Sequence, residues 1–174
     1  SNAAAQNARG LIKFDLSSIP SNATITSAVL SLYLASERSG NTRTMYAYRM
    51  LKNWSEASVT WNKLDASTNW TTAGGFGVAD CEQTAIGSVS LDAAEAVGWK
   101  TITLTAGAVE GWINGTLNNY GLLLKMDTES NDQYRFYSSN YTADATLQPK
   151  LTLEYTTPSL SDTGKVNFAF PAGE

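Results

Sequence analysis

The stretch LIKFDLSSIP, residues 11–20, reads as a β-strand that closes in a turn. Phe14 and Leu16 alternate with Lys13 and Asp15, which is the period of two expected of a strand with one buried face. The serines that follow favour a turn, and Pro20 lacks the backbone N–H that a strand ladder needs. The segment therefore predicts a strand over residues 11–16 and points to a β fold.

Short apolar runs separated by Gly, Asn, Asp and Ser recur along the rest of the chain. This pattern is typical of an antiparallel sandwich or barrel, and it lacks the alternation of strands and helices that a parallel α/β sheet needs. The unbroken apolar run at 120–126 indicates a central strand. The long segment 64–98 is glycine-rich and is expected to hold one or two weak strands within extended loops. The further predicted strands cover 28–34, 44–51, 99–104, 120–126, 134–138 and 150–155.

One segment departs from this pattern. Residues 106–113 carry Val109, Trp112 and Ile113 at helical spacing, and Asn114 and Gly115 then form a helix stop. We expect a short helix that covers one end of the sandwich. The predicted fold class is therefore all-β, an antiparallel β-sandwich with one short helix at a sandwich end.

The chain divides into a module and a tail. The sandwich pattern occupies residues 9–155, residues 1–3 resemble the scar of a removed tag, and a linker with a tail covers 156–174. Within the tail, Val166, Phe168 and Phe170 alternate with less apolar residues, as a strand does. An apolar strand pattern beyond the end of a domain needs a partner.

Composition excludes several classes of function. The chain is 43% hydrophobic and only 16% charged, against roughly 25% charged in an average soluble domain. Ser, Thr, Asn and Gly replace the missing charge, which favours a secreted or cell-surface protein. The net charge of −4 argues against nucleic-acid binding. The sequence contains no run of 18 or more apolar residues, so no membrane-spanning helix is predicted. Cys81 is the only cysteine, so no intrachain disulfide is possible and a buried position is expected.

The residues that catalysis would need are scarce. The chain has no histidine, which removes Ser/His/Asp and Cys/His nucleophile systems and His-based zinc sites. Most carboxylates fall in predicted loops, where capping of turns is their ordinary role. Asp15 and Glu56 lie in strand and loop motifs, and we expect them to bond loop backbone or an arginine. We predict that the module is not an enzyme.

Aromatic and cationic residues supply the candidates for ligand binding. Trp70 lies in a polar, glycine-rich loop and is the tryptophan that we expect to stack on a sugar ring, although burial over the sandwich end is the alternative. Trp54, Trp61 and Trp112 are expected to anchor core or loops, and Trp99 to be half-buried at the start of a strand.

Two arginines neighbour tyrosines on predicted strands. Arg49 shares a strand with Tyr46 and Tyr48, and Arg135 follows Tyr134. An arginine can bond a uronic-acid carboxylate with two parallel hydrogen bonds, so these residues suit recognition of an acidic polysaccharide. An ordinary cross-strand stack or ion pair would use the same residue types.

A possible structural calcium site is the one candidate for a cofactor. Asp127, Glu129, Asn131 and Asp132 offer oxygen ligands in one loop, although no glycine stands at the bend as in an EF-hand. A polar hairpin turn has the same composition. Asp80 and Glu82 form a second, weaker candidate.

Four segments in order resemble a known family. They are GLIKFDLSSIP at 10–20, WSE and VTWN within 54–62, YGLLLK at 120–125, and FYSS with QPKLTLEY within 136–155. Together they make the chain similar to the DNRLRE domain, which is related to the repeats of archaeal disaggregatase and to an alginate-binding carbohydrate-binding module family. The resemblance spans residues 9–155. It implies a jelly-roll-like sandwich that serves as an accessory or repeated module of large secreted and surface proteins, some of which bind acidic polysaccharides.

The chain departs from the family at its beginning, because relatives carry an extra strand before the Lys-Phe-Asp-Leu motif. A sandwich without that strand exposes an apolar groove and unpaired backbone groups. Either a degenerate strand at residues 3–8 or the tail at 165–170 could fill the gap by strand addition, within one molecule or between two. Two functions remain open: weak polysaccharide binding, and a ligand-free spacer or adhesin repeat that joins neighbouring domains of its parent protein.

Overall fold

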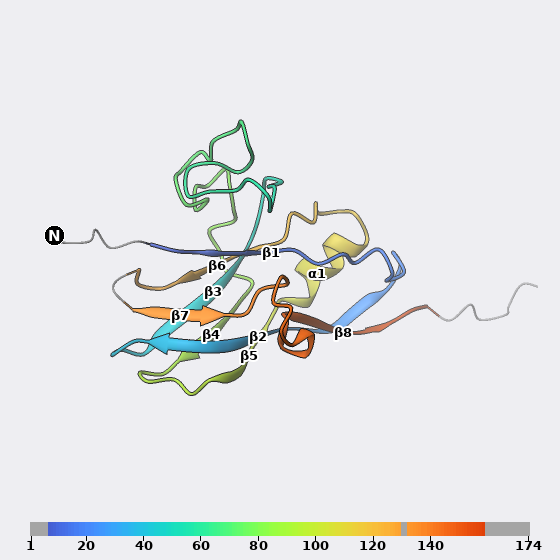
Figure 1. Ribbon diagram of the computed structural model, residues 1–174. Coiled ribbons are helices and arrows are strands. Elements are labelled where there is room, and N and C mark those ends of the chain that lie inside the picture. Colours follow the sequence, from blue (N-terminus) through green and yellow to red (C-terminus); the bar gives the residue numbers. More distant parts are fainter. Residues whose placement is uncertain (1–6, 130–131, 159–174) are drawn as a thin grey trace, which may run out of the picture.

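The computed structural model describes residues 7–129 and 132–158, which form two antiparallel sheets packed face to face with a short helix at one end (Figure 1). One sheet, sheet A, has the strand order β1-β6-β3-β4. The other, sheet B, has the order β5-β2-β7, with β8 also paired to β2. The elements are β1 (Gly10–Ile12), β2 (Thr24–Arg38), β3 (Arg43–Arg49), β4 (Gly87–Leu91), β5 (Gly98–Thr103), α1 (Ala106–Ile113), β6 (Leu122–Met126), β7 (Gln133–Phe136), the 3₁₀ turn η1 (Ala145–Leu147) and β8 (Lys150–Thr156).

This architecture confirms the predicted all-β sandwich with its helix, and β6 lies between two neighbours as a central strand should. The predicted first strand was too long, because pairing with β6 stops at Ile12. At that point Gly121 turns the partner chain away with a φ of +79°, and the side chain of Asn119 donates to the carbonyl of Phe14 at 3.0 Å. Residues 13–20 therefore continue as coil. The weak strand expected within 64–98 is β4.

The main core lies between the two sheets. On β2 the residues Leu30, Leu32 and Leu34 alternate with half-buried ones, and a register shift between Ile25 and Ser27 keeps the start of this long strand facing inward. Residues from β3, β4, β5 and β6 complete the cluster. A buried strand face of this kind specifies its register, because a slip of one residue would expose every inward side chain.

A second apolar cluster lies on the outer face of sheet A. The long connection between β3 and β4 folds over this face, and Leu64, Trp70 and Cys81 pack there with Leu123 of β6. Asp80 fixes the connection from within, because its fully buried carboxylate accepts the backbone N–H groups of Thr71 at 3.0 Å and Thr72 at 2.9 Å. The pKa of Asp80 reflects opposing effects: burial raises it, but these two N–H donors and Lys52 outweigh burial and lower it.

Helix α1 closes one end of the sandwich, as predicted from its spacing. Val109 and Trp112 are buried against the core, and Glu110 accepts the backbone N–H of Ile25 at 3.0 Å. The helix ends at Ile113, and Asn114 caps it before Gly115, which has a φ of +78°. No helix in the described part of the chain is long and apolar enough to cross a membrane.

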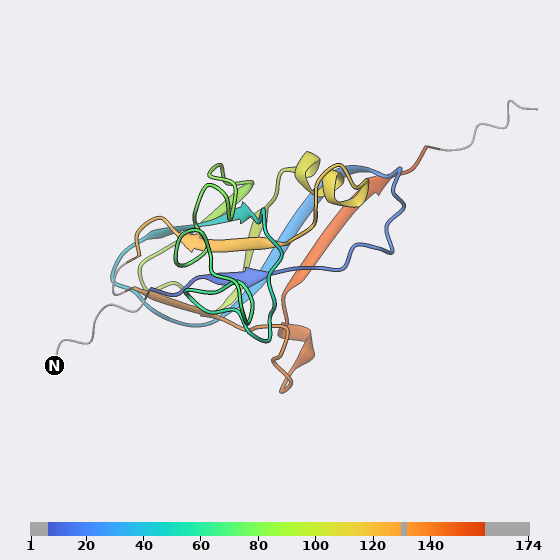
Figure 2. The same cartoon turned by 90° about the horizontal axis from the view of Figure 1, so that it is seen from above.

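The sandwich is closed along one side and open along the other. Strands β4 and β5 contact each other at the closed side. On the opposite side β1 and β7 form the edges of their sheets (Figures 1 and 2). A groove of about 1450 Å³ is lined by residues of both strands. A sandwich that lacks an edge strand would have such a groove.

Candidate functional site

An aromatic surface covers the outer face of sheet B. Tyr33 of β2 lies between the buried Leu32 and Leu34 and therefore points away from the core. Its register partner on β5 is Trp99, and the two rings meet edge to face with centroids 5.4 Å apart. Trp99 is 38% exposed, so part of its ring faces solvent.

The surface extends beyond β7. The backbone N–H of Tyr137 donates to the carbonyl of Tyr33 at 3.1 Å, and their rings stack with centroids 5.7 Å apart. Tyr141 then stacks on Tyr137 at 3.7 Å. The Tyr137 hydroxyl beside it is the main cause that raises the pKa of Tyr141. We call this set the aromatic surface: Trp99, Tyr33, Tyr137 and Tyr141.

Two cations border the aromatic surface. The ammonium group of Lys150, on β8, lies 4.3 Å from the ring centroid of Trp99, a cation–π contact. Arg135 is exposed on β7, and Tyr137 lies two residues further, just past the end of that strand and on the same side of the extended chain. Exposed rings can stack on the apolar faces of sugars, and the cations can bond their carboxylates.

Trp70, expected as the sugar platform, is instead buried. Only 6% of it is exposed, and its indole N–H donates to the carbonyl of Thr60 at 3.0 Å. Gly75 lies against its ring, and a Cβ added at Gly75 would lie 3.4 Å from the nearest ring atoms. The alternative of an aromatic folded over the domain is therefore the correct one, because the β3–β4 connection needs a large apolar residue to cover sheet A.

Arg49 is also unavailable to a ligand. It is 8% exposed and forms an ion pair with Glu82 of the β3–β4 connection, which is the ion-pair alternative to ligand binding. Tyr46 and Tyr48 point to the opposite side of β3, with their ring centroids 6.0 Å apart. Tyr48 packs edge-on against Phe76 at 4.7 Å. Arg49 and its neighbouring tyrosines therefore do not form one site.

Tyr134 and Arg135 separate in the same way. Tyr134 points inward, lines the open groove and donates its hydroxyl to the carbonyl of Asn41 at 3.0 Å. Arg135 points outward toward the aromatic surface. Of the predicted ligand residues, Arg135 alone borders the aromatic surface, because successive residues of a strand face opposite sides.

A second cation–aromatic cluster lies over sheet A. The guanidinium of Arg9 lies 4.7 Å from the ring centroid of Trp61 and bonds both carboxylate oxygens of Glu129, at 2.6 and 2.7 Å. This pairing is the largest cause that lowers the pKa of Glu129. Lys125 lies 5.1 Å from the ring centroid of Phe76. Each of these charged groups has a partner within the cluster. The contacts therefore link the chain next to β1 and the chain at the end of β6 to the β3–β4 connection.

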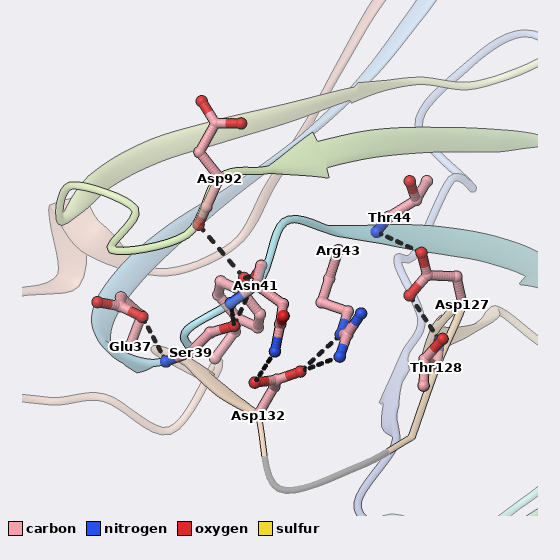
Figure 3. A network of polar contacts seen from close by, with 10 residues as sticks. Glu37, Ser39, Asn41, Arg43, Thr44, Asp92, Asp127, Thr128 and Asp132 are labelled. Atoms are coloured by element: carbon pink, nitrogen blue, oxygen red, sulfur yellow. Dashed lines mark hydrogen bonds and ion pairs between the residues drawn. The ribbon is translucent and has the colours of Figure 1, made fainter.

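Of the predicted calcium ligands, Asp127 and Asp132 bind separate partners (Figure 3). Asp127 accepts the backbone N–H groups of Thr44 and Thr128, at 3.1 and 2.5 Å. Asp132 pairs with Arg43 at 2.5 Å, and Glu129 is held by Arg9. Asn131 lies outside the described residues. Across the described ranges no three His, Cys, Asp or Glu residues group as metal ligands, since arginines and backbone N–H groups supply the positive partners.

Of the two acids in the strand and loop motifs, Asp15 bonds loop backbone as expected, whereas Glu56 bonds an asparagine side chain instead of backbone or an arginine. Asp15 accepts the backbone N–H of Ser17 at 2.9 Å, which lowers the pKa of Asp15, and Glu56 accepts the side chain of Asn140 at 3.1 Å. Asp80 holds backbone as described above, and Glu82 pairs with Arg49.

Tyr33, Tyr137 and Tyr141 are not among the ligand residues predicted from the sequence. The sequence signal for Tyr33 was its place in the alternation of the strand, because a tyrosine between two inward-facing leucines points to the other face. No comparable signal exists for Tyr141, which reaches the surface through an irregular loop.

Comparison with known proteins identifies one family. The family model described as the disaggregatase related repeat domain matches residues 2–153. A search of curated proteins found no match.

Proposed function

The chain belongs to the disaggregatase related repeat domain family, and from this premise we propose that it is a non-catalytic, carbohydrate-binding module of a secreted or cell-surface protein. The observation that supports the proposal is the aromatic surface on sheet B. Four aromatic rings gather on the outer face of one sheet, and one of them, Trp99, is 38% exposed. Stacking on sugar rings is the use that fits this arrangement.

The surface suits an extended polysaccharide. The four aromatic residues extend from β5 across β2 to the loop after β7, so several sugar units could lie along them. Lys150 and Arg135 favour a chain with carboxylates, which makes a uronic-acid polymer the first choice. Binding is weak, since most of each ring is already covered by its neighbours.

The test compares two tryptophans of equal exposure. Trp99 and Trp61 are each 38% exposed, Trp99 on sheet B and Trp61 over sheet A. Affinity electrophoresis through gels containing alginate, pectate or neutral glucans measures retardation of the wild type, Trp99→Ala and Trp61→Ala. We expect at least one polymer to retard the wild type, and Trp99→Ala to lose most of that retardation while Trp61→Ala keeps it. Equal loss in both variants, or retention in Trp99→Ala, would contradict the proposed surface.

Lys150 tests the choice of polymer. Lys150→Gln removes the charge and leaves a long side chain beside Trp99. We expect it to weaken retardation by uronic-acid polymers and to leave any retardation by neutral glucans unchanged. A uniform loss on both classes would mean that Lys150 acts through packing on Trp99.

The open groove favours a second candidate function. Edge strands with unpaired backbone can join another strand, so the module could serve as a ligand-free spacer or adhesin repeat that associates with neighbouring domains. Absence of retardation on every polymer, for a protein with a cooperative thermal transition, would favour this function over the first.

A further inference from the structure

Strand β8 has a free backbone edge. Within residues 7–129 and 132–158 it pairs with β2 alone, so the N–H and C=O groups along its other side have no strand partner there. The tail strand predicted at 165–170 lies outside the described residues. Strand β8 is seven residues long, and its ladder to β2 is regular over residues 150–154. A free edge of this kind can pair with a strand of another chain.

The two faces of β8 carry different residues. Leu151 and Leu153 are half-buried and face the core side, opposite buried residues of β2. Lys150, Thr152 and Glu154 alternate with them and are exposed on the outer face. Lys150 and Glu154 therefore stand two residues on either side of Thr152 and carry opposite charges.

We propose that β8 is a dimer interface, to which β8 of a second copy of this chain adds in antiparallel orientation with the two Thr152 residues opposite each other. In this register Lys150 lies opposite Glu154 of the second copy, and the twofold symmetry forms that pair twice. Leu151 lies opposite Leu153 on the core side. The charges select this register, because a centre at Lys150 or at Glu154 would place like charges directly opposite each other.

The same register covers an exposed ring. Tyr155 is 41% exposed, and it shares the core side of β8 with Leu151 and Leu153. The pairing places it opposite Pro149 of the second copy, a half-buried residue next to the start of β8. Proline has no backbone N–H to add to the ladder, so this contact is apolar and marks the end of the paired segment.

The charged side chains are available for the interface. Glu154 forms no ion pair within the described ranges. Lys150 contacts the ring of Trp99 on the β5 side of sheet B, and its long side chain can turn to a carboxylate that arrives on the free side of β8. The interface goes beyond the proposed carbohydrate binding and does not depend on it.

The first experiment exchanges the charges. Sedimentation velocity at low salt, over a range of protein concentrations and without carbohydrate, should show the wild type passing from monomer to dimer. Lys150→Glu and Glu154→Lys each place like charges opposite each other, so each should weaken dimerisation by roughly tenfold or more. An equimolar mixture of these two variants restores opposite charges in both pairs and should form a heterodimer.

Recovery in the mixture separates charge pairing from a general loss of structure in either variant. A wild type that stays monomeric, variants that dimerise as the wild type does, or a mixture that stays monomeric would each overturn the proposal. A monomer in which every amide from 151 to 155 resists hydrogen exchange would assign the free edge to another segment of the same chain, and would overturn it as well.

The second experiment locates the register with two cysteine variants on the same face. Thr152→Cys brings two thiols directly opposite each other, so mild oxidation should give a disulfide-linked dimer on non-reducing electrophoresis. Glu154→Cys places its two thiols about 14 Å apart along the strands, too far for a bond. Cys81 is buried and takes no part. Equal crosslinking of the two variants, or crosslinking of Glu154→Cys alone, would contradict the register.

Discussion

Replacement of Asp80 by asparagine tests how the β3–β4 connection is held on sheet A. The wild-type carboxylate is fully buried and accepts two backbone N–H groups, and Lys52 lies 3.5 Å away. Asparagine keeps the shape but only one acceptor oxygen, so its amide group faces an N–H donor. The unsatisfied N–H costs about 1–3 kcal/mol, and weaker bonding to a neutral acceptor adds to it.

We expect Asp80→Asn to lower the free energy of unfolding by about 3 kcal/mol and the melting temperature by roughly 6–12 °C. The matched control is Asp65→Asn, since Asp65 also accepts two backbone N–H groups, from Ser67 and Thr68 at 2.8 and 2.7 Å, but both donate to the same oxygen, in an exposed turn. Asparagine keeps that one acceptor oxygen and water can reach the turn, so a loss below about 1 kcal/mol is expected.

Urea unfolding followed by tryptophan fluorescence measures both variants, and hydrogen exchange locates the effect. The backbone amides of Thr71 and Thr72 should exchange faster in Asp80→Asn than in the wild type. The pKa of Asp80 is lowered in the folded protein, so its contribution is present at neutral pH and is lost as pH falls through the acid range below about 4. The difference between wild type and variant should therefore shrink in acid. Equal stability of Asp80→Asn and Asp65→Asn at pH 7, with unchanged exchange at Thr71 and Thr72, would refute this reasoning.

Three further predictions concern other parts of the fold. Gly121→Ala should lower the melting temperature by several degrees more than Gly115→Ala. Both glycines have a φ near +79°, but only at Gly121 would the new Cβ lie 2.3 Å from the carbonyl oxygen of Ile12. Equal shifts in the two variants would contradict this close approach. Cys81 should react with a thiol reagent at pH 8 only after unfolding, because burial raises the pKa of its thiol to about 11, and rapid labelling of the native protein would disprove it. The Arg9–Glu129 pair lowers the pKa of Glu129, so its contribution to stability is present at neutral pH and is lost below about pH 4. Thermal unfolding should therefore show a smaller drop in melting temperature on acidification for Glu129→Gln than for the wild type.

Much of the fold was predictable because period-two alternation reports one buried face. Residues 28–34 indicated β2, and the helical spacing of Val109, Trp112 and Ile113 indicated α1 within its observed bounds. The apolar run at 120–126 indicated the central β6. These signals are local, since each depends only on which side of one element is apolar.

The candidate site was less predictable because exposure depends on what packs over a residue. Trp70 lies in a polar loop, yet the β3–β4 connection folds it over sheet A, whereas Trp99 stays half-exposed on sheet B. Likewise the carboxylates of the 127–132 loop are spaced as metal ligands, but Arg9 and Arg43 approach them from distant segments.

The amino-acid sequence by itself determined the all-β class, the positions of most strands, the single helix and the membership of a repeat family. It did so because alternation, turn residues and ordered motifs are properties of neighbouring residues. Only the tertiary structure decided which aromatic rings share a surface, which charges neutralise one another and which side of the sandwich stays open. Those outcomes depend on contacts between segments far apart in the chain, such as Tyr33 with Trp99 and Arg9 with Glu129.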